Sequence, residues 1–494
     1  MKLRFLKNAV ILTATGFLLR GLGMVFRIYI SSRIGEEGMG VYQLITSAYF
    51  LFITLAQSGV SVTVTRLCAK YFALRQKDKA ESVLKSSITV SLFCSVFAAF
   101  MMFALSGVIS KYWIADQRAL MPLRILALSL PFIAVCNVLS GYFIATKNVT
   151  YGCTAQIVEQ LTRLGISAVA IILLSGKGIP ALLCGIVFAN TVSEAVSFAY
   201  LSICYALSEK SRFAAKGNFK REIIKGAYPV ALSRYLASAL HTAENMLVPT
   251  AMTLYCKSRT LALSQFGALK GMALPLLFFP FSFLSALSTL LVPEISDCKA
   301  KGSDKAAKNI VRRTCSITLV LSIMTGGAFF LFSDGLGKVI YGSERVSLIL
   351  KVLSPLVPFM YLDSICDGLL KGLGKQKQVL FNNCIDSALR IILIAILVPH
   401  FGLYGFLAVM VFSNITVSML NFRLLLKEVG LRCDILHWWV LPFCCFCISA
   451  IITKFLVPFG AYLPKILLGC TLFFLIFGCF ALIFKLQKNF YKNN

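Results

Sequence analysis

Apolar stretches of about twenty residues recur from one end of this 494-residue chain to the other, separated by short polar segments. A run of that length crosses the hydrocarbon core of a bilayer as an α-helix, in which every backbone group finds an internal hydrogen-bond partner. With 58% hydrophobic and 14% charged residues, the chain has too much apolar surface for a water-soluble protein. The sequence therefore predicts an all-α polytopic membrane protein.

The apolar stretches predict about fourteen transmembrane helices. The expected spans are 8–30, 40–60, 86–110, 121–145, 152–175, 180–206, 227–251, 263–293, 313–333, 348–370, 378–399, 403–425, 436–457 and 464–486. They predict four regions, namely a six-helix lobe (1–208), a basic cytoplasmic linker (209–226), a second six-helix lobe (227–428) and two further helices (429–494).

The two predicted lobes repeat one another in sequence. "PFIAVCNVLSGYF" (131–143) aligns with "PFMYLDSICDGLL" (358–370), and "FANTVSEAVSF" (188–198) aligns with "FSNITVSMLNF" (412–422). Matching stretches are separated by six spans, an even number, so both copies enter the membrane from the same side. A parallel pseudo-repeat of this kind is typical of transporters whose two lobes rock against each other.

The repeat also carries charge into the membrane. Glu159 and Arg163 lie four residues apart, as do Asp386 and Arg390 at the matching positions. An acid and a base at this spacing share one helix face and neutralise each other, which lowers the cost of burying them. Two interpretations stay open: each pair stabilises its lobe, or the pairs exchange partners and gate the transporter.

The first span, "ATGFLLRGLGMVFRIYI" (14–30), contains Arg20 and Arg27 and no acid. Seven residues are close to two helical turns, so the two arginines share a face. An arginine at bilayer depth is costly unless it snorkels, finds an acid or faces water. The planar guanidinium suits phosphate and pyrophosphate. The pair therefore predicts a cationic cavity for an anionic, phosphate-bearing substrate, with structural pairing as the alternative.

Two other cations fall within predicted spans, Arg234 and Lys270. The stretch that contains Lys270 also contains Pro275 and Pro280, which are expected to kink its helix. Either cation contacts the same substrate or pairs with an acid of a neighbouring helix. The candidate counter-ions for all four cations are Glu194, Glu244, Asp363 and Asp367.

The net charge of +29 does not indicate a nucleic-acid partner, because the basic residues gather in segments on one side of the predicted membrane. The richest are 70–85, 209–225 and 299–313, all on the side of the N-terminus. By the positive-inside rule, both termini are expected in the cytoplasm. These segments are also suited to contact with anionic lipid headgroups.

Sequence signatures of enzymes are missing. The chain has no Walker loop, G-x-S-x-G or H-E-x-x-H motif, and its three His are far apart. The 17 Cys follow no spacing that indicates a metal site. We therefore expect a protein that is not an enzyme and has no metal or organic cofactor, although a coupling ion, Na⁺ or H⁺, is compatible with a transporter.

Several stretches resemble the stage V sporulation protein B group of the multidrug/oligosaccharidyl-lipid/polysaccharide (MOP) exporter superfamily. They are "SSRIGEEGMGVYQL" (31–44), "AENMLVPTAM" (243–252), "FGALKGMALPLLFFPFSFLSALSTLLVPEISD" (266–297) and "VLSPLVPFMYLDSICDGLLKGLGKQ" (352–376). The resemblance implies fourteen helices in two six-helix lobes, a location in the bacterial inner membrane, and a link to spore cortex peptidoglycan.

Relatives in that superfamily flip undecaprenyl-pyrophosphate-linked sugars. The resemblance implies that Arg20 and Arg27 hold the pyrophosphate of a lipid II-type glycan precursor, and that a groove between spans 436–457 and 464–486 takes the prenyl tail. Membrane lipids and cell-wall synthases are the other expected partners. The alternatives are a cation-coupled multidrug antiporter of the same fold and a non-transporting partner of a spore-wall synthase.

Overall fold

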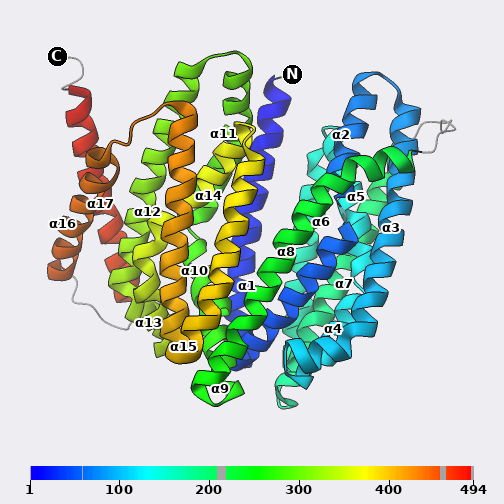
Figure 1. Ribbon diagram of the computed structural model, residues 1–494, viewed down its shortest axis with the longest axis horizontal. Helices are drawn as coiled ribbons and strands as arrows, with labels where there is room; N and C mark the ends of the chain where they lie inside the picture. Colours follow the sequence, from blue (N-terminus) through cyan, green and yellow to red (C-terminus); the bar gives the residue numbers. More distant parts are fainter. Residues whose placement is uncertain (1, 58, 209–218, 457–462, 491–494) are drawn as a thin grey trace. The chain divides into compact units, whose positions relative to one another are not determined.

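The computed structural model describes residues 2–57, 59–208, 219–456 and 463–490, and within these residues all regular structure is helical (Figure 1). By length and composition, ten of the described helices can cross a membrane, or eleven when the bent pair Gln117–Ala127 and Leu130–Ala145 is counted as one span. The prediction of an all-α polytopic membrane protein is confirmed. The count of fourteen spans stays a prediction.

The chain divides into two compact units. Unit 1 comprises Met1–Phe26 and Arg33–Leu247, and unit 2 comprises Arg27–Ser32 and Val248–Asn494. Two helices, α1 (Lys2–Gln57) and α8 (Lys220–Cys256), therefore contribute to both units. Of the predicted linker 209–226, residues 209–218 lie outside the described part of the chain.

Two long helical elements each cover two predicted spans. The elements α1, with 56 residues, and α15 (Gln376–Val429), with 54 residues, each consist of two helices that meet at a kink. Each is interrupted by one glycine with positive φ, Gly35 at 68° and Gly402 at 55°. A single glycine in this conformation redirects the chain without a polar loop, so the predicted loops at these points are reduced to breaks.

Unit 1 is a bundle built on α3 and α5–α7. Its remaining elements are α2 (Val60–Ala73), α3 (Lys77–Val108), η1 (Ile109–Trp113), η2 (Gln117–Ala119), α4 (Leu120–Ala127), α5 (Leu130–Ala145), α6 (Val149–Leu174) and α7 (Gly178–Leu207). Apolar side chains from α2, α3, α5 and α7 form its core, among them Val64, Leu84, Leu139, Phe143 and Leu201. Glu37 of α1 forms an ion pair with Arg118 of η2 at 2.6 Å.

Unit 2 continues from the last turns of α8. Its elements are α9 (Arg259–Phe266), η3 (Gly267–Ala273), α10 (Leu274–Phe278), α11 (Phe281–Ala300), α12 (Asp304–Tyr341), α13 (Glu344–Leu353), η4 (Ser354–Leu356), α14 (Val357–Gly372), α15, η5 (Leu436–Val440), α16 (Leu441–Leu456) and α17 (Leu463–Phe490). The two C-terminal helices pack on α12 through Phe332, Cys445, Phe473 and Phe477.

The internal repeat is visible in where the helices break. In unit 1, α4 and α5 meet at an angle of 44° just before Pro131. In unit 2, the 3₁₀ turn η4 separates α13 from α14 just before Pro358, the residue that aligns with Pro131. Proline fixes its own backbone and lacks an N–H, so it interrupts a helix at the same place in both copies.

Candidate functional site

The two arginines of the first span lie on α1, and the boundary between the units falls between them. Arg20 is exposed in unit 1. Arg27 is half-buried in unit 2, where it interacts electrostatically with Tyr341 of α12. Neither guanidinium forms a hydrogen bond or an ion pair with another described residue. The structure thus leaves the donors of both arginines available to a ligand or to water.

The other two predicted cavity cations have different surroundings. Arg234 is exposed on α8 in unit 1. Lys270 is half-buried in η3, a π-helical turn of unit 2, and its Nζ lies 5.7 Å from the centroid of the Phe406 ring. A cation over an aromatic face is stabilised by the ring quadrupole. The Lys270 ammonium therefore has an aromatic partner, Phe406, within unit 2. Arg234 forms no ion pair with an acid among the described residues.

In unit 1, the predicted pair becomes a triad of charges. Arg163 of α6 is hydrogen-bonded to Glu159 one turn earlier, and its Nη2 lies 3.5 Å from the carboxylate of Glu194 on α7. Glu194 is only 9% exposed. One guanidinium thus serves two carboxylates, so the group carries an excess negative charge when both acids are ionised. Tyr49 of α1 lies within electrostatic range of the triad and is hydrogen-bonded to Ser129.

In unit 2, the matching pair is completed by a hydroxyl instead of a second acid. Arg390 and Asp386 lie 3.2 Å apart. Ser413 accepts hydrogen bonds from Arg390 Nε at 3.0 Å and Nη2 at 2.8 Å, and donates to Asp386 Oδ1 at 2.5 Å. Charge-assisted hydrogen bonds of this kind are strong. The pair is therefore neutral and closed, in contrast to the triad of unit 1.

A second polar chain runs beside this pair. Asn382 donates to Asn421 at 2.8 Å, and Asn421 donates in turn to the Asp363 carboxylate of α14 at 2.8 Å. Asn421 is fully buried. The chain links both halves of α15 to α14, and among the described residues the Asn421 amide is the donor that holds the Asp363 carboxylate.

These contacts decide the partners of three predicted counter-ions. Glu194 pairs with Arg163, Asp363 accepts from Asn421, and Asp367 pairs with Lys371 at 2.5 Å. None of the three is in contact with Arg20, Arg27 or Arg234. Glu244 is buried on α8, with 2% of its surface exposed.

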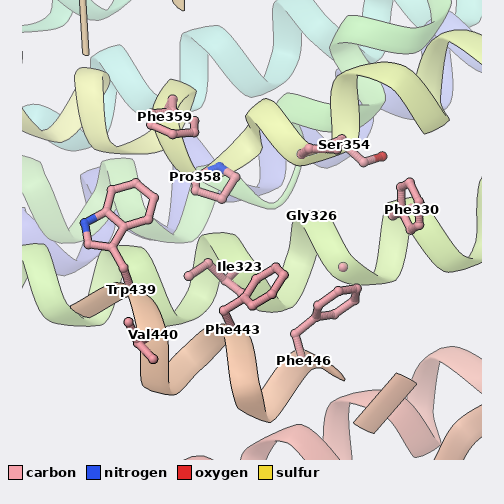
Figure 2. A pocket seen from close by; sticks show the side chains of 12 residues that line it. Ile323, Gly326, Phe330, Ser354, Pro358, Phe359, Trp439, Val440, Phe443 and Phe446 are labelled. Carbon is pink, nitrogen blue, oxygen red and sulfur yellow. The ribbon is translucent and has the colours of Figure 1, made fainter. Parts of the chain in front are cut away.

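Unit 2 contains an apolar cavity of about 630 Å³. Figure 2 shows its lining: Ile323, Gly326 and Phe330 of α12 face Pro358 and Phe359 of α14 and Trp439, Val440, Phe443 and Phe446 of η5 and α16. Such a volume is typical of ligand pockets.

This cavity lies at a different place from the expected tail-binding groove, which stays a prediction. The groove was predicted between the last two helices, whereas this cavity lies between α16, α12 and α14. Phe473 of α17 packs edge-on against Phe446 of α16. Glycine makes the room: a Cβ on Gly327 would come within 2.4 Å of the Phe446 ring.

Sequence reasoning found the charged pairs but not the polar residues that complete them. Ser413 and Asn421 lie in the stretch 412–422, whose sequence predicts the repeat but not the hydrogen bonds of these two side chains. Their role depends on which face of α15 meets the other half of the same helix, and the break at Gly402 sets that. Among the described residues, no group of His, Cys, Asp and Glu is arranged to hold a metal ion.

Solved structures define the class of protein. The lipid II flippase MurJ in an inward closed conformation aligns with a TM-score of 0.72 at 15% identity, covering 97% of this chain and 99% of that one. An inward-facing multidrug resistance MATE family transporter of the MOP superfamily aligns with a TM-score of 0.69 at 15% identity, covering 85% and 98%. The chain therefore has the fold of the MOP transporters.

Sequence comparisons give the family. Residues 5–255 match the family described as polysaccharide biosynthesis protein, and residues 260–396 match the MatE family. The chain thus belongs to the polysaccharide biosynthesis protein family. Stage V sporulation protein B of Bacillus subtilis (strain 168) is 28% identical over 93% of this chain and 91% of its own length. The lipid II flippase MurJ of the same organism is 20% identical over 88% and 85%.

These findings confirm the predicted likeness to stage V sporulation protein B, the fold shared with the MOP transporters, and the multi-pass membrane location. The solved structures with this fold named above are a flippase and a transporter, and one of the relatives in sequence is a lipid II flippase.

Proposed function

We propose that this protein is a flippase that moves an undecaprenyl-pyrophosphate-linked glycan of the lipid II type across the bacterial inner membrane. Arg20 and Arg27 bind the pyrophosphate in this proposal. The observation that carries it is a contrast between arginines at bilayer depth. Arg163 and Arg390 are paired with carboxylates, whereas Arg20 and Arg27 have no acid partner among the described residues. An arginine without an acid is stable in a membrane span where it snorkels to the interface or lies beside water or an anion, and we propose that these two face the anion.

The apolar cavity of unit 2 supports a lipid-linked substrate. It lies beside three membrane-spanning helices, and five aromatic side chains line it. A cavity of this composition is filled by hydrocarbon at bilayer depth, since water would find almost no polar partner there. We infer that it accommodates part of the prenyl chain while the headgroup crosses.

The charged triad of unit 1 supports coupling to a cation gradient. When both acids are ionised, Glu159, Arg163 and Glu194 together carry one excess negative charge. Uptake of one cation, H⁺ or Na⁺, neutralises it, which favours the conformation in which the triad is most buried. The matching pair of unit 2, Asp386 and Arg390, carries no such excess.

The proposal places both termini in the cytoplasm, as the basic segments predict. From the resemblance to the stage V sporulation protein B group, to which a relative of that name at 28% identity adds support, we propose that the glycan serves spore cortex peptidoglycan. A cell-wall synthase that consumes the delivered precursor is then the expected protein partner.

Translocation of fluorescent lipid II in proteoliposomes that contain only the purified protein tests this function. Movement of the headgroup to the opposite leaflet, faster than in protein-free liposomes, is the expected result. Efflux of cationic dyes with no movement of lipid II would instead identify a multidrug antiporter. If the folded protein moves neither, it acts as a non-transporting partner.

A further inference from the structure

Unit 2 has a second pocket, which differs from the apolar cavity in place and in chemistry. Its volume is about 310 Å³, and it lies where α8 ends, α13 begins and the two halves of α15 meet. The lining side chains include Tyr255, Gln265, Glu344, Arg345 and Tyr404. Two aromatic rings, an amide, a carboxylate and a guanidinium thus converge on one small hollow.

The backbone break in α15 positions the aromatic side of the pocket. Gly402 has φ 55°, and a Cβ at this position would lie 2.4 Å from a ring carbon of Tyr255. Glycine therefore allows the Tyr255 ring to rest directly on the break. Tyr404 follows two residues later. The two tyrosines are 50% and 63% exposed, so both rings keep free surface.

The polar side of the pocket is held in place by neighbouring residues. Arg345 donates from Nη1 to the Ser264 hydroxyl at 2.8 Å, and Lys338 forms an ion pair with Glu344 at 2.9 Å. Gln265 accepts a hydrogen bond from the Cys256 thiol through Oε1 at 3.6 Å, which points its amide group away from that contact. Arg345 and Gln265 are thus held before any ligand arrives, whereas the Glu344 side chain is 84% exposed.

This set of groups selects against most ligand classes. A simple anion would meet Glu344, and a simple cation would meet Arg345. A hydrocarbon chain would strip water from charged and amide groups that it cannot replace. A saccharide satisfies all of them: its hydroxyls both donate and accept, as carboxylate, guanidinium and amide require. The apolar C–H face of its ring packs on the negative face of an aromatic ring.

We propose that this pocket binds a sugar of the glycan headgroup. The inference rests on the proposed function and extends it, because it assigns a site for the saccharide separate from the arginines that hold the pyrophosphate. The positive-inside pattern places the end of α8 at Cys256 on the side away from the cytoplasm. The pocket therefore receives the headgroup on the face where the glycan is delivered.

Exposed tyrosines near a membrane boundary also serve as interfacial anchors, and the test must separate that role from sugar binding. Saturation-transfer NMR with the full-length protein in nanodiscs and the soluble disaccharide N,N′-diacetylchitobiose does so. We expect transfer from the wild-type protein, at least tenfold weaker binding in Tyr404→Ala and Gln265→Ala, and unchanged binding in Tyr404→Phe. Tyr112→Ala is the matched control, since Tyr112 is 69% exposed in unit 1 and distant in sequence from every lining residue.

The outcomes separate the two proposals. Absence of transfer from the folded wild-type protein, or equal binding in Tyr404→Ala and Tyr112→Ala, overturns the pocket whatever lipid II translocation shows. Disaccharide binding that depends on Tyr404, in a protein that does not move lipid II, supports the pocket and contradicts the flippase. A second arm compares lipid II with undecaprenyl pyrophosphate. We expect Gln265→Ala to weaken the binding of lipid II and to leave the binding of undecaprenyl pyrophosphate unchanged, since undecaprenyl pyrophosphate has no sugar.

Discussion

The Ser413 hydroxyl donates a hydrogen bond to the Asp386 carboxylate at 2.5 Å, across the break that divides α15 into two halves. The same hydroxyl accepts from Arg390. One serine therefore joins the two halves of the longest helix in unit 2 through a half-buried charged pair. This arrangement makes a first prediction possible.

We expect Ser413→Ala to lower the free energy of unfolding by about 1.5–3 kcal/mol, the usual range for hydrogen bonds to charged groups. Thermal unfolding in detergent, followed by intrinsic fluorescence, measures the change. Ser418→Ala is the matched control on the same half-helix, because the Ser418 hydroxyl is buried with no hydrogen-bond partner. Equal losses in the two variants would show that the Ser413 bonds do not stabilise the fold.

A second prediction concerns the excess charge in unit 1. Glu194→Gln removes one of the two acids that share Arg163, so the triad no longer needs a cation. We expect lipid II translocation by this variant to lose its response to an imposed pH or Na⁺ gradient, with folding retained. Asp304→Asn, which changes an exposed acid in the first turn of α12, should keep the response. A response in Glu194→Gln equal to that of the wild type contradicts the coupling site.

A third prediction concerns the apolar cavity. Val440→Trp places a large ring where Figure 2 shows a small side chain at the cavity wall. We expect at least a tenfold slower translocation of lipid II and little change in thermal stability, since Val440 is 44% exposed. Ile451→Trp adds the same ring to α16, the helix that continues from η5, at a position with 58% exposure outside the cavity lining. If both variants translocate at the same rate, the prenyl chain does not use this cavity.

The sequence was sufficient to predict the membrane class, the repeat and the ion pairs within one helix. Apolar run length and the four-residue spacing of Glu159 with Arg163 are local properties, and both appear as predicted. The position of Pro131 and of Pro358 marked matching stretches, and the helices break at both.

Other features depend on contacts between segments far apart in sequence. Glu194 is thirty-one residues from Arg163, so its choice of that partner follows from how α7 packs on α6. The apolar cavity arises from Gly326 and Gly327 facing two distant helices. The breaks at Gly35 and Gly402 replace predicted loops, because positive φ in one glycine turns the chain without polar residues.

The most direct test of the proposed flippase is lipid II translocation under an imposed membrane potential by Arg20→Ala and Arg27→Ala. Arg66→Ala is the matched control, since Arg66 is an exposed arginine of α2. Each charged hydrogen bond to pyrophosphate contributes roughly 1.5–3 kcal/mol, so each variant should translocate about 10–100 times more slowly, with unchanged folding. Wild-type rates in both variants would show that these arginines do not hold the pyrophosphate, and would contradict the account.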